Sequence, residues 1–491
     1  MARYKPDLRQ SYQLLTGSLE ALLPEDSVAR DIAAGLEQLD FSSFDQLYSN
    51  DEAGCTAIDP RALAGIIIFS LLRGVTSSVK LAELCVTQVE FRWLARGVPV
   101  EKSTLCAFRK NHVDELLDMS TQILTALGRN GLLPGENMGV DGSIVRAASS
   151  RHASKKRKRL EKAHGHLEQV LREKLEGDDQ ENQAEEPTEA GHVKKRRERV
   201  TRALEEMTRR GLNGQEDKLT VSEPDAGVKR QKDGSFAPGY NAQVVSDLDS
   251  GVIVHAEIVD AANDSGQLGP QIAKARAALE ETNAGPSTNG MLSVTADAAY
   301  HDTRQLHELE GNGTACYVPE ARNTNRKAPG IADEYQAEAF GYDEVTDTVR
   351  CPEGQKLAPR KANRTNTATV YEAPAKVCAA CPAKPKCCPN TKGGRSVNRT
   401  MEHYQATLDH VAAGLETEEG ERRWTQRRIT CEGVFARLTE LLHWRRNRMW
   451  ESLGAKAELA WRVLTHNLLI LLGVWKPMTL GDPPGICGNQ V

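Results

Sequence analysis

The sequence lacks a long apolar run and an apolar leader. Its 491 residues begin MARYKPDLRQSYQLL, which has none of the apolar stretch of a signal peptide. The longest apolar runs, 63–72 and 468–475, are far shorter than the roughly 20 residues that cross a membrane. These absences exclude an integral membrane protein, and we expect a cytoplasmic one.

An excess of basic residues is also missing. The formal net charge is −5, which does not indicate a nucleic-acid binder. The basic residues are clustered, however, so total charge is a poor guide to partners. A hydrophobic content of 39% is ordinary for a globular chain, and 491 residues suffice for two or three domains.

Cysteine is present in an odd number, 11, and five of these residues lie between Cys351 and Cys388. Without an export signal, this favours reduced thiols and a metal site over disulfides. Cys378 and Cys381 have the spacing of two thiolates on one tetrahedral Zn²⁺. Cys351 and Cys387 complete four ligands, with Cys388 as a substitute. The alternative is a set of free or iron-binding cysteines.

Residues 1–130 have helical patterns. Leucines between Leu14 and Leu23 keep a helical period, and an apolar helix begins at Pro60 and ends by Gly74. A further helix, 105–117, carries Arg109 and Lys110. The short helices around it fit a DNA-binding helix-turn-helix or a plain packing and dimerisation bundle equally well.

Two short apolar stretches end in aspartate. Asn137 to Ser143 is predicted to be a strand that stops at Asp141, where Asp141-Gly142 would turn the chain, and Leu292 to Ala296 a strand that stops at Asp297. Two aspartates at strand ends are typical of a Mg²⁺ site. The alternative is that both are ordinary turn residues. With the strands predicted around the 247–251 turn, this gives about four strands.

Residues 151–215 interrupt the strands with two basic blocks, 155–159 and 194–199, around an acidic middle. The apolar spacing predicts two amphipathic helices joined by a disordered link. The alternating charge favours a solvated helical hairpin over a phosphate-binding arm.

An arginine-rich helix is predicted after residue 416. Eight arginines lie between Arg422 and Arg448 against two glutamates, and one of these, Glu432, keeps a helical period with Phe435 and Leu438. Glu432 is either a third acid of a metal site or a surface ion pair of little energy.

Together, VDGS at Asp141, TADAAY at Asp297 and RRITCEGVF at Glu432 resemble the DDE set of bacterial insertion-sequence transposases. The chain is most similar to the group with an InsH-like N-terminal domain and a cysteine-containing insertion before the glutamate. The segments that carry this likeness are FSSFDQLYSNDEAG, VEFRWLARG, STLCAFRKNH, GYNAQVVSD, AANDSGQL, CPEGQKL, CAACPAKPKC and RVLTHNLLILL.

The resemblance implies a mixed α+β fold: a helical N-terminal domain at 1–130, then an RNase H-like mixed sheet flanked by helices at 131–480. Insertions would lie at 151–215 and 335–400, and 481–491 would be a flexible tail. It also implies DNA cleavage and strand transfer at inverted-repeat ends, with Asp141, Asp297 and Glu432 holding two Mg²⁺ (or Mn²⁺) ions. The protein would bind element ends and target DNA as a homodimer or larger oligomer, near the nucleoid. The predicted DNA contacts are Arg109, Lys110, Arg428, Arg437, Arg445, Arg446 and Arg448.

The family signature around the glutamate is met only in part. Arg428 and Glu432 are in place, but Thr425 stands where tyrosine is expected and Thr439 where lysine is expected. Arg437, Arg445 or Arg446 would have to replace that lysine. Two alternatives follow: a DNA-binding relic without catalysis, and a nuclease of the same fold that cuts without joining.

Overall fold

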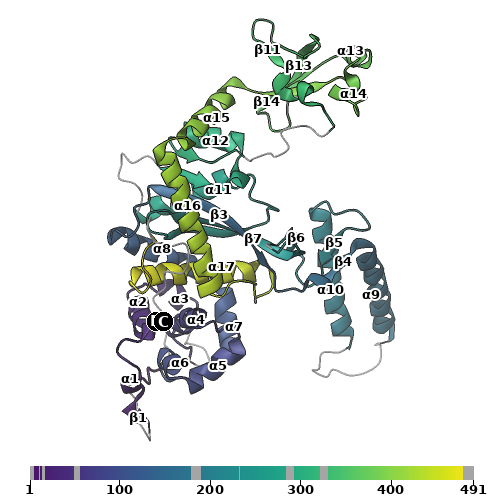
Figure 1. Cartoon of the computed structure of the whole chain (residues 1–491). Helices are drawn as coiled ribbons and strands as arrows, with labels where there is room; N and C mark the ends of the chain where they lie inside the picture. The colour runs from purple at the N-terminus through teal and green to yellow at the C-terminus, as the bar shows by residue number, and fades with distance from the viewer. Residues whose placement is uncertain are drawn as a thin grey trace.

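The computed structural model describes residues 5–9, 12–13, 17–48, 56–177, 189–231, 233–283, 292–320 and 330–478. A body built on one mixed sheet carries the N-terminal helices below it, and two smaller parts project from it (Figure 1). We call the projecting helical pair the arm and the projecting cysteine-containing part the cysteine lobe.

The N-terminal part is helical and packs around α4. Asp59 caps that helix by accepting a 2.8 Å hydrogen bond from the Arg61 amide, and Pro60 occupies its first turn, where no amide partner is needed. The helices are α1 (Leu19–Leu22), α2 (Val28–Glu37), α3 (Ser42–Asp45), α4 (Pro60–Leu72), α5 (Ser78–Thr87), α6 (Val89–Leu94), α7 (Lys102–Asn111) and α8 (Val113–Arg129).

The central sheet combines parallel and antiparallel pairs. Its order is β10-β9-β3-β7-β6, and β8 also pairs with β7. β3 is parallel to β9 and antiparallel to β7, and β9 is parallel to β10. The strands are β3 (Asn137–Arg146), β6 (Gly227–Arg230), β7 (Phe236–Asp247), β8 (Ile253–Val259), β9 (Ser293–Ala296) and β10 (Ala315–Tyr317). This curled mixed sheet between helices is consistent with the RNase H-like fold, and the α+β class is confirmed.

Helices pack around the sheet and join it to the N-terminal part. α16 (Glu418–Ala436) contacts β3 and β9, while α11 (Leu268–Thr282) contacts β7 and β8. α17 (Glu451–Leu471) lies between β8 and the N-terminal helices α4, α7 and α8. The side-chain amide of Asn467 both accepts from the Ile253 amide and donates to its carbonyl, so it satisfies the open edge of β8. The other helices are α12 (Thr303–Gly311) and α15 (Glu402–Leu415), with a π-helical turn at Arg437–Leu441.

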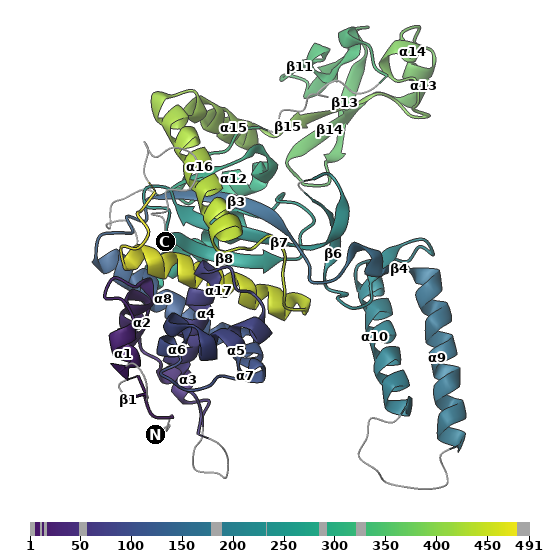
Figure 2. The same cartoon turned by 60° about the horizontal axis from the view of Figure 1, so that its bottom comes forward.

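The arm and the cysteine lobe leave the body in different directions (Figures 1 and 2). The arm consists of α9 (Arg157–Gly177) and α10 (Glu189–Arg209), and β4 (Ser154–Lys156) pairs with β5 (Lys218–Thr220) at its base. The lobe has an antiparallel sheet in the order β11-β12-β13-β14-β15 and two short helices, α13 (Ala375–Ala379) and α14 (Lys384–Cys387). Its strands are β11 (Gly341–Asp343), β12 (Thr348–Arg350), β13 (Lys356–Ala362), β14 (Ala368–Glu372) and β15 (Ser396–Thr400).

Two local expectations are wrong. β3 continues through Asp141 and Gly142 without a turn, because these residues pair with Val244 and Gln243 of β7. The helix expected from Leu14 to Leu23 is reduced to α1, preceded by the short strand pair β1 (Tyr12–Gln13) and β2 (Gly17–Ser18). Residues 14–16, the link at 178–188 and the tail at 481–491 lie outside the described residues.

Within the described ranges, no helix has the length and apolar character that a bilayer crossing requires.

The buried pair Glu458 and Arg462 of α17 generates a stability prediction. Both side chains are almost fully buried, and Glu458 also accepts from the Met449 amide at 2.9 Å. Glu458→Ala leaves the Arg462 guanidinium buried without its counter-ion, so we expect a loss of about 3–5 kcal/mol in the free energy of unfolding. The control is Glu308→Ala, which breaks the exposed pair with Arg304 on α12 and should cost at most about 1 kcal/mol. Denaturant titration measures both. Equal, small losses would show that the buried pair is not needed.

Candidate functional site

The register of the sheet brings Asp141 and Asp297 together. Val140 of β3 is paired with Ala296 of β9 in a parallel ladder. The residues that follow them, Asp141 and Asp297, therefore lie beside each other on neighbouring strands, which are about 4.8 Å apart in a sheet. Two aspartates that are more than 150 residues apart in the sequence are thus neighbours across the β3–β9 pair.

Arg427 of α16 contacts both aspartates. Its Nη2 donates to Asp141 Oδ1 at 2.9 Å and lies 3.7 Å from Asp297 Oδ2. The arginine side chain is only 8% exposed, whereas that of Asp297 is 39% exposed. The guanidinium therefore supplies positive charge between two carboxylates from the buried side, and the carboxylate of Asp297 remains accessible from solvent.

The environment of Asp141 disfavours its ionised form. Burial is the largest cause and raises the pKa of its carboxyl to about 6; Arg427 opposes this effect, and the nearby charges of Asp297 and Asp264 add to it. A buried carboxyl with a strongly perturbed pKa and a specific charged partner is a candidate for a functional site.

Asp264, Gln243 and Tyr300 form a polar layer beside Asp141. Gln243 Nε2 donates to Asp264 Oδ1 at 2.7 Å, and Tyr300 Oη donates to Gln243 Oε1 at 2.5 Å. Gly142 permits this approach, since a Cβ there would collide with all three side chains. The layer fixes the surroundings of Asp141 and places a third carboxylate near it.

Glu432 lies on the same helix as Arg427 but on a different face. Five residues at 3.6 per turn place it about 140° around α16 from Arg427, and its side chain is exposed. In the part of the chain that the structure describes, no three Cys, His, Asp or Glu side chains are arranged to hold a metal ion. The structure thus brings two of the three predicted acids together, and metal binding by the set stays a prediction.

The predicted DNA-contacting arginines divide into buried and exposed ones. Arg109 and Arg437 are 4% and 3% exposed, and their guanidinium groups donate to the carbonyls of Thr76 and Lys476. In the structure these two arginines join separate protein segments and are enclosed, whereas the sequence predicts that they contact DNA. The exposed residues are Arg428, Arg445, Arg446 and Arg448, and Lys110 is half-buried.

A cavity of about 270 Å³ opens beside β3 beyond Asp141. Ser143, Arg146, Thr439 and Arg445 are among the residues that line it. Arg445 therefore lies on the same cavity as Thr439, the position where the family signature has lysine.

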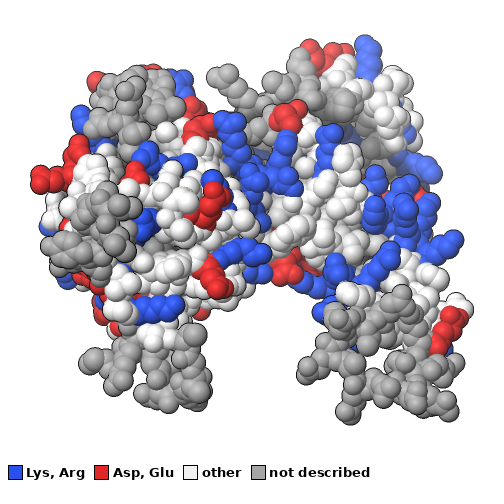
Figure 3. Space-filling model, turned by 90° about the horizontal axis from the view of Figure 1, so that it is seen from below, with Lys and Arg blue, Asp and Glu red and all other residues white. Residues whose placement is uncertain are grey.

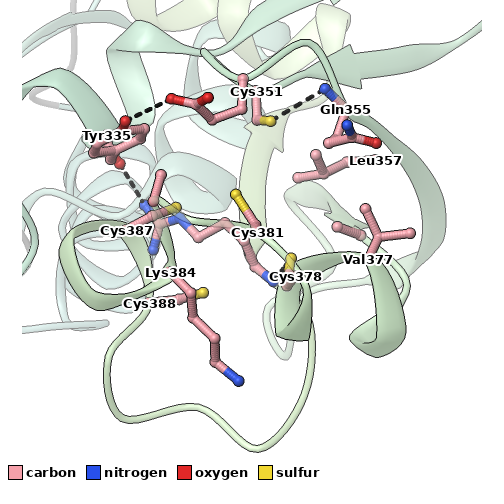
Figure 4. Close-up of a pocket in the computed structure, with 14 residues that line it drawn as sticks. Tyr335, Cys351, Gln355, Leu357, Val377, Cys378, Cys381, Lys384, Cys387 and Cys388 are labelled. Carbon is pink, nitrogen blue, oxygen red and sulfur yellow. Dashed lines mark hydrogen bonds between the residues drawn. The ribbon is translucent and has the colours of Figure 1, made fainter.

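The cysteine lobe contains a second candidate site (Figure 4). Five thiols line one cavity of about 20 Å³: Cys351, Cys378, Cys381, Cys387 and Cys388. The sulfurs of Cys351 and Cys378 each accept a backbone amide at 3.3 Å, from Gln355 and Arg395. Burial raises the pKa of Cys387 to about 11, and the neighbouring Cys388 thiol adds to this. The cavity gathers soft ligands from three separate loops and helices.

Two comparisons with protein families match the chain. Residues 17–111 match the model described as Transposase domain (DUF772), and residues 350–472 match the model described as Transposase DDE domain. No curated protein and no solved structure shows significant similarity to the chain.

Both matches are to transposase domains, and the mixed sheet lies between them in the sequence, so the chain carries the parts of a transposase with a DDE domain. The order of the two domains is consistent with an insertion-sequence DDE transposase. The DDE match includes Glu432 and the five clustered cysteines but neither Asp141 nor Asp297, so the register of the sheet is what places those aspartates in a common site.

Sequence reasoning missed Arg427 and selected its neighbour Arg428. The signal was present, because Arg427, Cys431, Val434 and Leu438 recur at helical spacing and all are buried. An arginine within a buried helical stripe needs a counter-ion, and the two strand-end aspartates were candidates.

The raised pKa of Asp141 predicts a pH-dependent stability. The unfolded chain releases this proton near the ordinary aspartate pKa of 3.8 and the folded chain only near a pKa of about 6, so the folded state holds an extra proton between these two pH values. Stability therefore falls as pH rises through this window. Asp141→Asn removes the ionised form, so the variant should unfold like the parent near pH 4 and be more stable, by up to about 3 kcal/mol, near pH 8. Thermal melts in chelator-treated buffer measure this. A variant that is less stable than the parent near pH 8 would show that the contact with Arg427 dominates.

Proposed function

We propose that this transposase cuts DNA at the inverted-repeat ends of a mobile element and joins the cut strands to target DNA by metal-assisted phosphoryl transfer. Asp141, Asp297 and Glu432 would hold Mg²⁺ or Mn²⁺. The observation that carries the proposal is the paired position of Asp141 and Asp297 around Arg427. Two carboxylates on adjacent strands are the oxygen ligands that a hard divalent ion prefers, whereas Glu432 lies on another face of α16 and would have to move to join them.

The chain's own residues position the reaction. The rigid ladder of β3 with β7 and β9 holds Asp141, and the strand end holds Asp297 where solvent and a phosphate can reach it. Divalent ions held there would supply activation of the attacking water or 3′-hydroxyl and charge stabilisation of the leaving oxygen. Arg445, beside the cavity that Thr439 lines, would supply the phosphate contact that the family lysine makes elsewhere.

We also propose that the cysteine lobe binds a structural zinc ion through Cys351, Cys378, Cys381 and Cys387, with Cys388 as the alternative fourth ligand. In support, two of these sulfurs accept hydrogen bonds from backbone amides, the kind of outer contact that orients metal ligands. A divalent ion would reverse the effect of burial on the thiol pKa values, because a coordinated thiol is deprotonated. The thiols must still move together, since as arranged no three of the described donors hold a metal.

The carboxylate prediction separates cutting from binding. Asp297→Asn and Glu432→Gln keep side-chain shape but remove a metal-binding charge, so nicking should fall at least about a hundredfold while DNA binding survives. The substrate is a duplex containing the DNA that flanks the gene, assayed with Mg²⁺ by nicking and gel shift. The matched control is Glu421→Gln, an exposed glutamate on the same helix, which should cut as the parent does.

The outcomes also distinguish the alternatives. If Asp297→Asn cuts as well as the parent, the proposed mechanism is wrong. If the parent binds the fragment but never nicks it, the relic alternative gains. Nicking without joining of ends to a second duplex would favour the nuclease.

The zinc prediction uses metal content as its measurement. Purified protein should contain roughly one zinc per chain, and Cys378→Ser with Cys381→Ser should lose it. Cys106→Ser, an exposed cysteine on α7 outside the lobe, should retain it. Elemental analysis that finds no zinc in the parent, or equal zinc in both variants, would reject the site.

A further inference from the structure

The arm has its own small core, which leaves its outer faces free for another role. Buried side chains hold α9 against α10 and against the strand at the base: Leu160, Leu167, Val200, Ala203, Met207 and Leu219. The pair therefore stands away from the body as a packed unit (Figure 2). Packing explains the apolar stripe of each helix, but it does not explain the charge.

The charge of α10 is concentrated in one segment. Six of the nine residues from Lys194 to Arg202 are lysine or arginine, and one is glutamate. At the base of the arm, Lys156 and Lys158 both pair with Glu216. Within the described residues, by contrast, no ion pair involves Lys194, Lys195, Arg196 or Arg199, and all four are exposed. These side chains retain uncompensated positive charge.

One face of this segment is turned toward the body. Lys195, Arg199 and Arg202 are three or four residues apart and so lie on the same side of α10. Arg202 Nη1 donates to Glu451 Oε1, at the start of α17, at 2.7 Å. Arg209, seven residues further on, donates to Asp260 Oδ2 of the body at 2.9 Å. Lys195 and Arg199 thus continue the body-facing stripe about 10 Å beyond the last contact, into open space.

α7 lies on the opposite side of Glu451. Lys110 Nζ is 3.9 Å from Glu451 Oε2, so one carboxylate is shared by a cation from each helix. Ser103, two turns before Lys110, is exposed on the same side of α7, the adjacent Lys102 at the start of the helix is also exposed, and Trp450 next to Glu451 is 48% exposed. We call the space between α7 and α10, with Glu451 at its floor, the notch. Figure 3 shows the body and the arm standing apart, with Lys and Arg side chains gathered on both sides of the gap.

We propose that the notch binds a length of duplex DNA through its phosphates, outside the carboxylate site. Duplex DNA is negatively charged on every side, so it fits a space with cations on two facing walls. The contacts are from lysine and arginine to the backbone, so binding here is independent of base sequence and positions the duplex. This proposal rests on the proposed function only in taking DNA as the substrate, and it assigns the arm a role that packing alone does not provide.

The test compares two double variants of the arm that remove the same charge. Lys195→Ala with Arg199→Ala removes two unpaired cations from the notch, and Lys156→Ala with Lys158→Ala removes two that already pair with Glu216. Fluorescence anisotropy with a labelled duplex of arbitrary sequence, at several salt concentrations, gives affinity and salt dependence. The first variant should bind roughly tenfold more weakly at low salt, with a salt slope shallower by about one for each side chain removed. The second should bind as the parent does.

Each other outcome has a definite meaning. If the two variants lose affinity equally, the effect is one of total charge, and the notch is rejected. If Lys195→Ala with Arg199→Ala binds like the parent, while the parent binds and nicks DNA, the arm proposal alone fails. If the parent binds no duplex at all, the proposed function fails with it. All four side chains are exposed or half-buried, and circular dichroism verifies that both variants fold.

Discussion

The burial of α17 on all sides from Trp461 to Ile470 is the constraint on which the arrangement of the molecule depends. A helix that is buried all round must be enclosed by separate layers. Here β8 lies on one side and α4, α7 and α8 lie on the other. Trp461 donates to the Arg109 carbonyl at 3.1 Å, and Asn467 satisfies the edge of β8. Residues from the two ends of the chain thus form one core, and the N-terminal helices are fixed relative to the sheet.

This fixed frame sets the positions of the two projecting parts. The arm is inserted between β3 and β7, the strands that hold Asp141, and the cysteine lobe lies between β10 and α16, which carries Arg427 and Glu432. The arm therefore begins just after the strand that carries Asp141, and the chain returns from the lobe to α16 through α15 (Glu402–Leu415). DNA bound by the arm would be positioned relative to the carboxylate site through these strands and helices.

Local patterns in the sequence predicted several elements well. The strand before Asp297, the hairpin turn at 247–251, the two arm helices and the helix that carries Glu432 all have the expected form. Each of these elements is determined by the spacing of apolar residues, by turn residues and by helix caps, all of which involve residues close together in the sequence.

What the sequence did not reveal depends on long-range pairing. Asp141-Gly142 has the composition of a turn, but the partner strand β7 satisfies its backbone and keeps it extended. Arg109 and Arg437 are the residue type that contacts DNA phosphates, but tertiary packing encloses both side chains. Whether Arg427 or Arg428 meets the aspartates depends on which face of α16 packs on the sheet. Adjacent residues of a helix point about 100° apart, so only one of the two can face it.

Arg427 also changes the energetics of metal binding that the proposed site would have. Without it, two adjacent carboxylates would repel each other, and an incoming divalent ion would simply relieve that repulsion. With the guanidinium in place, uptake of the proposed metal ion would be an exchange of one cation for another, and the measured affinity would be the difference between two attractions. An exchange of this kind favours loading when DNA phosphates also offer the displaced guanidinium a new anion. Substrate and metal would then bind cooperatively, without any change in the fold.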